Sequence, residues 1–283
     1  MRRELMQISL PFMYDFDRAL DRLSLDPLHA VDLSGKSVQV PMPEGNSIMV
    51  KALGTTEKPV FAIEGATSGQ EGRVKELFHF HQSLEPINEH FKGTSLAHLF
   101  EEHRGTPLVR EFSLYGSLMK SIIHQQLNLS FAHTLTSRFV QKYGEEKDGV
   151  WFYPEPDIIA GIDVKELREL QFSTRKAEYV IGLSQAIAEG RLDIAGMEEK
   201  ADEEITAELI SYRGIGPWTA QNFLLFGLGR PNLFPLADIG LQNALKIQWK
   251  LAEKPKAEEI LKHLPGWSPY LSYAALYLWR SLE

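Results

Sequence analysis

The chain has 283 residues, with 30 lysines and arginines against 38 aspartates and glutamates, and a formal net charge of −8. The absence of cysteine excludes disulfides, a cysteine nucleophile, thiolate zinc sites and a cysteine-bound iron–sulfur cluster. No apolar run is long enough for a membrane span and no signal-peptide core follows the basic start, so we expect a cytoplasmic protein without a membrane partner. The acidic balance argues mildly against a nucleic-acid partner, although a global sum does not describe local patches.

Residues 1–95 have the pattern of a small α+β domain. Residues 15–20 predict a helix that begins at an acidic cap. Strand-like alternation of apolar and polar residues occurs in three segments, 37–42, 47–52 and 59–64. Residues 43–46 form a turn between the first two strands, and the pattern becomes helical from residue 72.

From residue 96 onward the whole pattern is helical, which predicts a second domain over residues 96–283. Apolar stripes at helical spacing recur along this part, and by default they form core. Examples are Leu114, Leu118, Ile122, Phe131, Leu135, Phe139, Leu167, Leu170, Ala177 and Val180. We therefore expect a mainly α fold with an N-terminal α+β domain.

Residues 209–220 predict a helix, a glycine turn and a second helix. Gly214 and Gly216 permit backbone angles that other residues avoid, and Pro217 suits the first turn of the second helix. The free backbone N–H groups and the positive helix end suit a phosphate, in a contact that holds nucleic acid without reading its sequence. Without other signals, such a turn between packed helices carries no function.

Asp238 lies about twenty residues past this turn, immediately before another helical run. Taken alone, it is best interpreted as a helix N-cap, which aspartate favours strongly. The upstream turn adds a catalytic interpretation. The two roles are compatible, because both place an anion at a helix N-terminus.

These features together resemble the helix-hairpin-helix superfamily of DNA base-excision glycosylases. In that family a hairpin of the form Leu-x-x-x-x-Gly-Ile-Gly-x-x-Thr-Ala precedes an essential aspartate. The matching residues are Leu209, Gly214, Ile215, Gly216, Thr219, Ala220 and Asp238. Four further segments match family motifs in the same order: residues 121–127, 152–156, 175–180 and 272–279. Residues 10–16 resemble the opening of the N-terminal domain in the bacterial 3-methyladenine DNA glycosylase II subfamily.

The resemblance implies two helical lobes, roughly residues 113–230 and residues 96–112 with 231–283, and an active site in the cleft between them. It implies a monomer that binds duplex DNA, flips out an alkylated purine such as 3-methyladenine or 7-methylguanine, and hydrolyses its N-glycosidic bond for base excision repair. Asp238 would stabilise the cationic sugar of the transition state. Related enzymes that also cut the strand carry a lysine two positions after the second hairpin glycine. Trp218 stands there, so we expect simple hydrolysis.

The resemblance also assigns contacts with the base and the duplex. Trp218 and Tyr270 match pocket aromatics, whose ring faces attract a cationic base, although either could be a core aromatic. Asn222 stands where some relatives have tyrosine, which leaves the base range open. Gln126, with Leu127, matches the residue that wedges into the duplex, but could be a polar residue of a helix–helix loop.

Further contacts concern the hairpin itself. The residues that match the family's DNA-backbone contacts are Gly214, Ile215, Gly216 and Thr219. The backbone carbonyls of Ile210, Tyr212 and Ile215 match positions that hold a structural sodium or potassium ion in relatives. No cofactor is expected for catalysis. His124 next to the wedge could be a general acid, but a solvated or core-capping histidine is the better interpretation.

Three alternatives remain open from the sequence. A non-catalytic DNA-binding protein could keep the hairpin, although Asp238 in its family context argues against this. A glycosylase for oxidised or mismatched bases is disfavoured by the missing cluster cysteines and hairpin lysine. A helical scaffold without a DNA role would leave the shared motifs unexplained.

Overall fold

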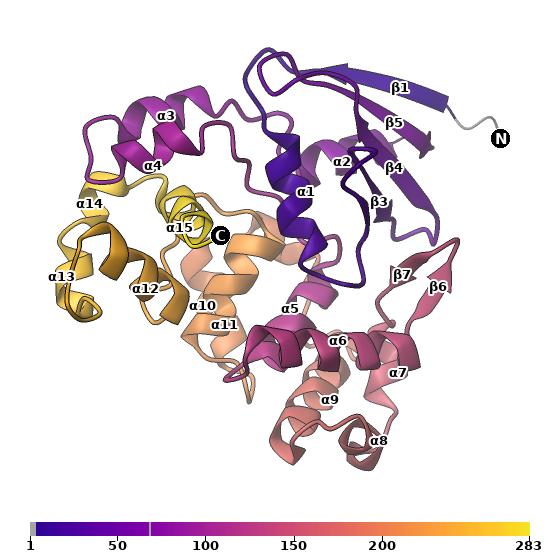
Figure 1. Ribbon diagram of the computed structural model, residues 1–283. Helices are drawn as coiled ribbons and strands as arrows, with labels where there is room; N and C mark the ends of the chain where they lie inside the picture. The colour runs from indigo at the N-terminus through magenta and orange to yellow at the C-terminus, as the bar shows by residue number, and fades with distance from the viewer. Residues whose placement is uncertain (1–3, 68) are drawn as a thin grey trace.

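The computed structural model describes residues 4–67 and 69–283. Its N-terminal part is a five-stranded antiparallel sheet in the order β1-β5-β4-β3-β2, seen on the right of Figure 1. The strands are β1 (Glu4–Ser9), β2 (Ala30–Asp32), β3 (Ser37–Pro41), β4 (Ser47–Ala52) and β5 (Val60–Ala66). Val38, Val50 and Ile63 face one another across three strands and are buried. Their side chains form one core with helices α1 (Phe16–Ser24) and α2 (Gln70–Leu77).

The predicted strands over 37–42, 47–52 and 59–64 are confirmed as β3, β4 and β5. The acidic helix cap is also confirmed, because the Asp15 side chain accepts a hydrogen bond from the Arg18 N–H at 3.1 Å. Strands β1 and β2 were not anticipated. Strand β2 has only three residues, which is too short for an alternation pattern.

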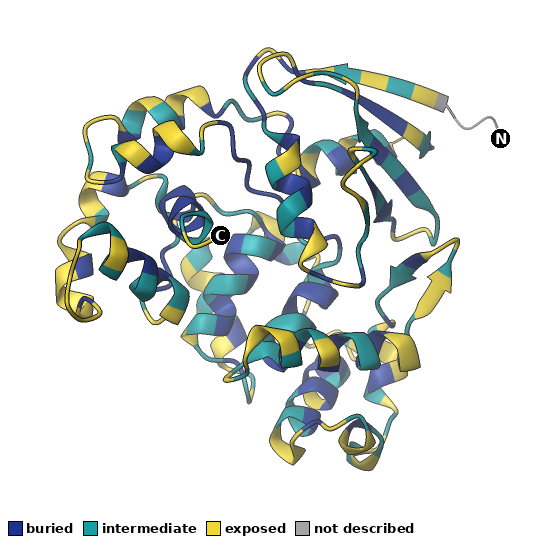
Figure 2. Cartoon of the chain, in the orientation of Figure 1, coloured by how far each residue is buried: buried dark blue, intermediate teal, exposed yellow. Residues whose placement is uncertain are grey.

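The rest of the chain is mainly helical and contains two cores (Figure 1). The first core is built mainly from α5 (Leu114–His124), α6 (Leu129–Tyr143), α7 (Pro156–Ala160), α8 (Val164–Glu169), α9 (Thr174–Ala188), the 3₁₀ turn η1 (Gly196–Glu199), α10 (Asp202–Ile210), α11 (Pro217–Asn222) and the π-helical turn η2 (Phe223–Gly227). The second is built mainly from α3 (Glu85–Phe91), α4 (Ala97–Glu102), α12 (Ile239–Gln248), α13 (Ala257–Leu261), α14 (Leu264–Trp267) and α15 (Leu271–Arg280). Figure 2 shows buried residues on the inward faces of these helices.

The expectation that everything after residue 96 is helical was wrong at one place. A two-stranded antiparallel hairpin, β6 (Glu145–Lys147) and β7 (Val150–Phe152), follows α6. Its turn residues Asp148 and Gly149 have φ of 52° and 78°, the left-handed pair that an Asp-Gly hairpin turn requires. The Asp-Gly pair is a sequence signal for such a hairpin, and the prediction of continuous helix did not take it into account.

The position of α3 bears on the expected domain boundary near residue 95. Ile87 and Phe91 of this helix are buried in the core that contains α12 and α15, not in the core of the sheet. The boundary itself stays a prediction. Within residues 4–67 and 69–283, no helix has the length and hydropathy needed to cross a bilayer.

Candidate active site

Asp238 is the N-cap of α12, as the sequence predicts. Its Oδ1 accepts two hydrogen bonds, from the Leu241 N–H at 2.9 Å and from the Trp279 indole Nε1–H at 2.9 Å. No donor in the described part of the chain reaches Oδ2. One carboxylate oxygen therefore fixes the side chain between α12 and α15, and the other is available for chemistry.

Gly240 makes this arrangement sterically feasible. A Cβ atom at this position would lie 3.0 Å from Asp238 Oδ1 and 3.1 Å from Trp279 Nε1. Trp279 was singled out in the sequence only as part of a terminal motif and was not assigned to the site. Its indole contact with Asp238 makes it a functional residue that the sequence analysis missed.

A cavity of about 310 Å³ lies among residues of the α1–β2 segment, α5, α6 and α11, and no described residue of α12 or α15 lines it. Trp218 and Asn222 line it from α11, Phe226 from η2, and Leu127 from the α5–α6 loop. The Phe226 ring centroid is 5.6 Å from the Trp279 ring, so a single aromatic contact separates the cavity wall from the residue that holds Asp238. The structure thus brings together Trp218 and Asn222, two of the three residues predicted for the base pocket, with Leu127, which was predicted for the duplex wedge.

Tyr270 is not part of this arrangement. Its ring packs edge-on against His90 of α3 at 5.3 Å, and it precedes α15 while Trp279 is near the other end of that helix. Nine residues of helix separate the two positions by about 13 Å along the axis. The assignment of Tyr270 to the base pocket is therefore not supported by its position, and Trp279 is the aromatic side chain beside Asp238.

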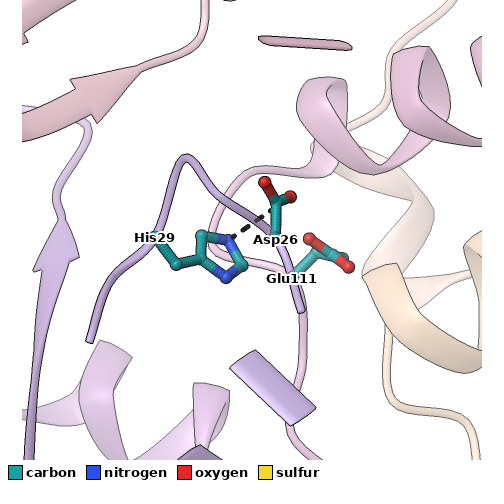
Figure 3. A group of neighbouring side chains, drawn as sticks. All are labelled: Asp26, His29 and Glu111. Carbon is teal, nitrogen blue, oxygen red and sulfur yellow. Dashed lines mark ion pairs between the residues drawn. The ribbon is translucent and has the colours of Figure 1, made fainter. Parts of the chain in front are cut away.

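Charged side chains also line the cavity. Lys120 Nζ lies 2.6 Å from Asp26 Oδ2 and 2.9 Å from the nearer Glu111 oxygen. Figure 3 shows Asp26, His29 and Glu111, whose ligand-type atoms all lie within 4.8 Å of one another. This grouping resembles a metal site, but the Lys120 ammonium already contacts both carboxylates. The ammonium therefore supplies the positive charge that a metal ion would bring.

The physical environment sets the charges of this cluster. Burial raises the pKa of Asp26 and Glu111, but attraction to Lys120 and His29, together with the hydrogen bonds that both carboxylates accept, leaves both pKa values below their usual range. Burial lowers the pKa of His29, which is therefore neutral near pH 7. The guanidinium of Arg22 lies 4.0 Å over the Phe226 ring. Two carboxylates, Asp26 and Glu111, and three cations, Arg22, Arg110 and Lys120, thus line the cavity.

His124 also lines the cavity, and its environment excludes the general-acid role. Its Nε2 lies 3.1 Å from the Thr136 hydroxyl oxygen. Burial, followed by the nearby Lys120, lowers the pKa of His124 to about 3. The imidazole is neutral near pH 7 and has no proton to give as a cationic acid.

The predicted hairpin connects α10 to α11. Gly214 has φ +94°, and a Cβ atom there would lie 2.2 Å from the Tyr179 ring, so only glycine fits. Gly216, by contrast, has no neighbour within 4 Å of its Cβ position. The backbone N–H groups of Gly214, Gly216 and Trp218 donate to no residue that the structure describes. The turn therefore presents free donors next to open space.

The other two hairpin residues predicted to contact DNA face inward. Ile215 is 5% exposed and Thr219 is 1% exposed. The Thr219 hydroxyl accepts a hydrogen bond from Gln125 Nε2 at 2.9 Å. Both residues can offer only backbone groups to DNA, so their side chains hold the hairpin to the core.

The predicted wedge residues follow α5. Gln126 is exposed and has φ +56°, which places it at the outer end of a tight turn. Leu127 is half-buried and lines the cavity. The two residues therefore differ in position, and Gln126 is the one that projects from the surface.

A larger cavity of about 660 Å³ lies elsewhere, between the end of β3 and the segment after β7. Aromatic and aliphatic residues dominate its wall, including Met42, Phe112, Leu114 and Trp151. None of the residues that the sequence assigned to the site lines it. Size alone therefore does not locate the site.

The two hairpin glycines yield a paired prediction. Gly216→Asp places a carboxylate beside the free N–H groups, so affinity for any DNA duplex falls while the melting temperature stays near that of the parent. Gly216→Ala is the matched control and retains affinity. Gly214→Ala instead destabilises the fold, because Tyr179 and the positive φ exclude a side chain. Duplex binding by fluorescence anisotropy and thermal melts test both; unchanged affinity of Gly216→Asp contradicts the hairpin contact.

Comparisons with known proteins agree with this geometry. Residues 119–269 match the model of the HhH-GPD superfamily base excision DNA repair protein. The chain is 54% identical to the putative DNA-3-methyladenine glycosylase YfjP of Bacillus subtilis, over 98% of this chain and 99% of that protein. It is 32% identical to a second Bacillus subtilis protein, a DNA-3-methyladenine glycosylase, over 74% of this chain and 71% of that protein.

The fold is also that of solved glycosylase structures. The 3-methyladenine DNA glycosylase from Archaeoglobus fulgidus superimposes with a TM-score of 0.81 at 24% identity, covering 97% of both chains. The Schizosaccharomyces pombe 3-methyladenine DNA glycosylase Mag1, in complex with abasic DNA, gives a TM-score of 0.62 at 25% identity, over 69% of this chain and 96% of that one. With a family match over more than half its length, the chain belongs to the HhH-GPD superfamily of base excision DNA repair proteins.

Proposed function

We propose that this protein is a monofunctional DNA glycosylase that hydrolyses the N-glycosidic bond of alkylated purines in duplex DNA. The observation that carries the proposal is Asp238, whose Oδ1 is fixed by two donors while Oδ2 accepts from no described residue. Its partner Trp279 contacts Phe226, which lines the cavity that also contains Trp218. The names of the similar Bacillus subtilis proteins support the same activity.

The reaction follows from this geometry. The hairpin N–H groups hold a phosphate of the backbone, and Gln126 enters the stack as the target nucleotide leaves it. The extruded base lies against Trp218 in the cavity. As the bond to the base breaks, positive charge develops on the sugar and the free oxygen of Asp238 stabilises it. The base departs with the bonding electrons, water adds to the sugar carbon and loses a proton to solvent, and an abasic site remains.

Cationic alkylpurines suit this cavity because the ring face of Trp218 attracts a positive base. The carboxylates of Asp26 and Glu111 offset part of the charge of the cations on the same wall. Methylated purines also leave readily, so the protein needs to supply only modest stabilisation. We infer that 3-methyladenine and 7-methylguanine are preferred over neutral bases.

We also propose a sodium or potassium ion at the hairpin. The carbonyl oxygens of Ile210 and Ile215 accept no hydrogen bond from any described residue, while Tyr212 O accepts one from the Ile215 N–H at 3.1 Å. Carbonyl oxygens are suitable ligands for such a hard cation. When bound, the ion would add positive charge beside the phosphate without taking part in bond cleavage.

A panel of duplexes with one defined lesion each tests the proposed function directly. We expect release of 3-methyladenine and 7-methylguanine, measured as alkali-labile abasic sites. Binding of the same duplexes without release of any alkylated base would identify a non-catalytic DNA-binding protein. Release only of oxidised or mismatched bases would assign the protein to another glycosylase class.

The first variant removes the catalytic charge. Asp238→Asn keeps an oxygen that accepts from Leu241 and Trp279, so the fold and lesion-DNA binding persist. Excision falls by at least about 100-fold, the loss typical of removing one transition-state stabiliser. Single-turnover kinetics with 7-methylguanine duplex measure the effect. Near-parental excision by a folded Asp238→Asn protein refutes the catalytic assignment.

The second prediction concerns the absence of a lyase step. Trp218 occupies the hairpin position at which a lysine would form a Schiff base with the sugar. Incubation with lesion duplex and borohydride therefore yields no covalent protein–DNA adduct, and product strands break only after alkali. A trapped adduct on a denaturing gel would show that another amine attacks the sugar.

The third prediction concerns base selectivity. Trp218→Ala reduces excision of 3-methyladenine and 7-methylguanine about 2- to 30-fold more than excision of hypoxanthine, because ring–cation attraction is worth about 0.5–2 kcal/mol. Tyr270→Ala is the matched control, since Tyr270 packs on His90 away from the cavity, and it leaves the ratio unchanged. Equal losses for charged and neutral bases would reduce Trp218 to a packing role.

A further inference from the structure

Helix α9 holds the turn that carries Gln126. Lys176 on this helix donates to three backbone oxygens at the end of α5: Ile122 O at 3.1 Å, Ile123 O at 2.5 Å and Gln125 O at 2.6 Å. An ammonium group has three donors, so all of them are used. The cation also lies at the negative end of the α5 dipole, where positive charge is stabilising.

This lysine has no carboxylate partner among the described residues, unlike Lys120. Burial lowers the pKa of Lys176 to about 8. A desolvated ammonium without a counter-ion is costly unless its hydrogen bonds are satisfied. The three carbonyls meet that requirement and at the same time fix the backbone that precedes Gln126.

Gln125 links the same turn to the hairpin. Its side-chain Nε2 donates to Gly214 O at 2.8 Å and to Thr219 Oγ1 at 2.9 Å. The backbone of Gln125 is thus held by Lys176, and its side chain by the phosphate-binding turn. Gln126 follows at once, in the left-handed conformation at φ +56°.

The other contact of α9 is with the hairpin itself. Tyr179 lies one turn after Lys176, on the same side of the helix, and its ring is the group that excludes a Cβ atom at Gly214. One helix therefore supports two DNA-facing elements that lie about ninety residues apart in the chain. Their relative position depends on Lys176, Gln125 and Tyr179.

We propose that Lys176 is a positioning residue that sets Gln126 relative to the hairpin, and so couples the grip on the phosphate to extrusion of the base. The inference rests on the proposed function, in which Gln126 enters the duplex. Lys176 itself touches neither the base nor the sugar. Its removal should therefore impair flipping more than binding.

The test uses 2-aminopurine placed next to the lesion, whose fluorescence rises when the neighbouring base is extruded. Lys176→Met keeps the length of the side chain and removes its donors. We expect at least a roughly fivefold fall in the flipping equilibrium, the lower end of coupling factors between linked sites. Affinity for undamaged duplex depends on the hairpin N–H groups and should stay within about twofold of the parent. This bound corresponds to the few tenths of a kcal/mol by which mutations at distant sites depart from additivity.

Two controls separate this role from a loss of charge or of stability. Lys165→Met removes one exposed lysine from α8 and should change neither flipping nor binding. Gln125→Leu breaks the link from its other side and should reproduce the flipping defect. If Lys176→Met fails to fold, Gln125→Leu and the charge-retaining Lys176→Arg carry the test, with Lys176→Arg closer to the parent than Gln125→Leu.

A double-mutant cycle decides the mechanism. If Lys176 acts through Gln126, then Lys176→Met adds no further flipping defect to Gln126→Ala, whereas independent effects would add. Additive effects, or equal losses in flipping and in binding to undamaged duplex, would overturn the proposal. The fluorescence assay reports base flipping even if no alkylated base is excised. A failed excision assay would therefore reject the proposed function, while the role of Lys176 could still be tested by fluorescence.

Discussion

The site depends on the approach of α12 and α15 at Asp238. A carboxylate that accepts from the Leu241 N–H and the Trp279 indole with the same oxygen cannot rotate without losing both bonds. Gly240 is the reason that the indole can come so close, since any side chain there would meet both partners. A fixed charge needs little reorganisation when a cation forms beside it, which is the basis of electrostatic catalysis. In the proposed function, two helices of the second helical core therefore hold the carboxylate at which the sugar would react.

The N-terminal domain takes part in building the cavity. Asp26 and His29 come from the segment after α1, and they meet Glu111 and Lys120 of the helical part at the cavity wall. Separating these charges would leave a buried charge without its partner, which is strongly destabilising. The cluster therefore holds the segment after α1 against α5. Lys120 offsets one of the two negative charges in this cluster. No role for the N-terminal part of the chain could be predicted from the sequence. In the structure it forms part of the cavity wall, with Arg22 on the ring of Phe226.

Local signals in the sequence predicted much of the fold and of the site. The three strands with clear alternation, the caps at Asp15 and Asp238, and the glycine turn at Gly214 all depend on residues close in sequence. The errors have the opposite character. The β6–β7 hairpin was overlooked within a helical pattern, and the contact between Trp279 and Asp238, which joins residues 41 positions apart, was not predicted. Such pairings depend on helix packing, which no local pattern encodes.

The protein is acidic overall, yet DNA is its partner. The contacts made by several lysine and arginine side chains explain how these two facts are compatible. Lys120 pairs with two carboxylates, Lys176 binds three carbonyls, and Arg230 pairs with Asp202 while donating to the backbone of η1. These three cations hold loops and helix ends in place. In the proposed function, the phosphate is bound by backbone N–H groups of the hairpin, which carry no formal charge and need no lysine. A small footprint of this kind grips the backbone without reading its sequence, so recognition of damage depends on the cavity and on whether the base can leave the stack.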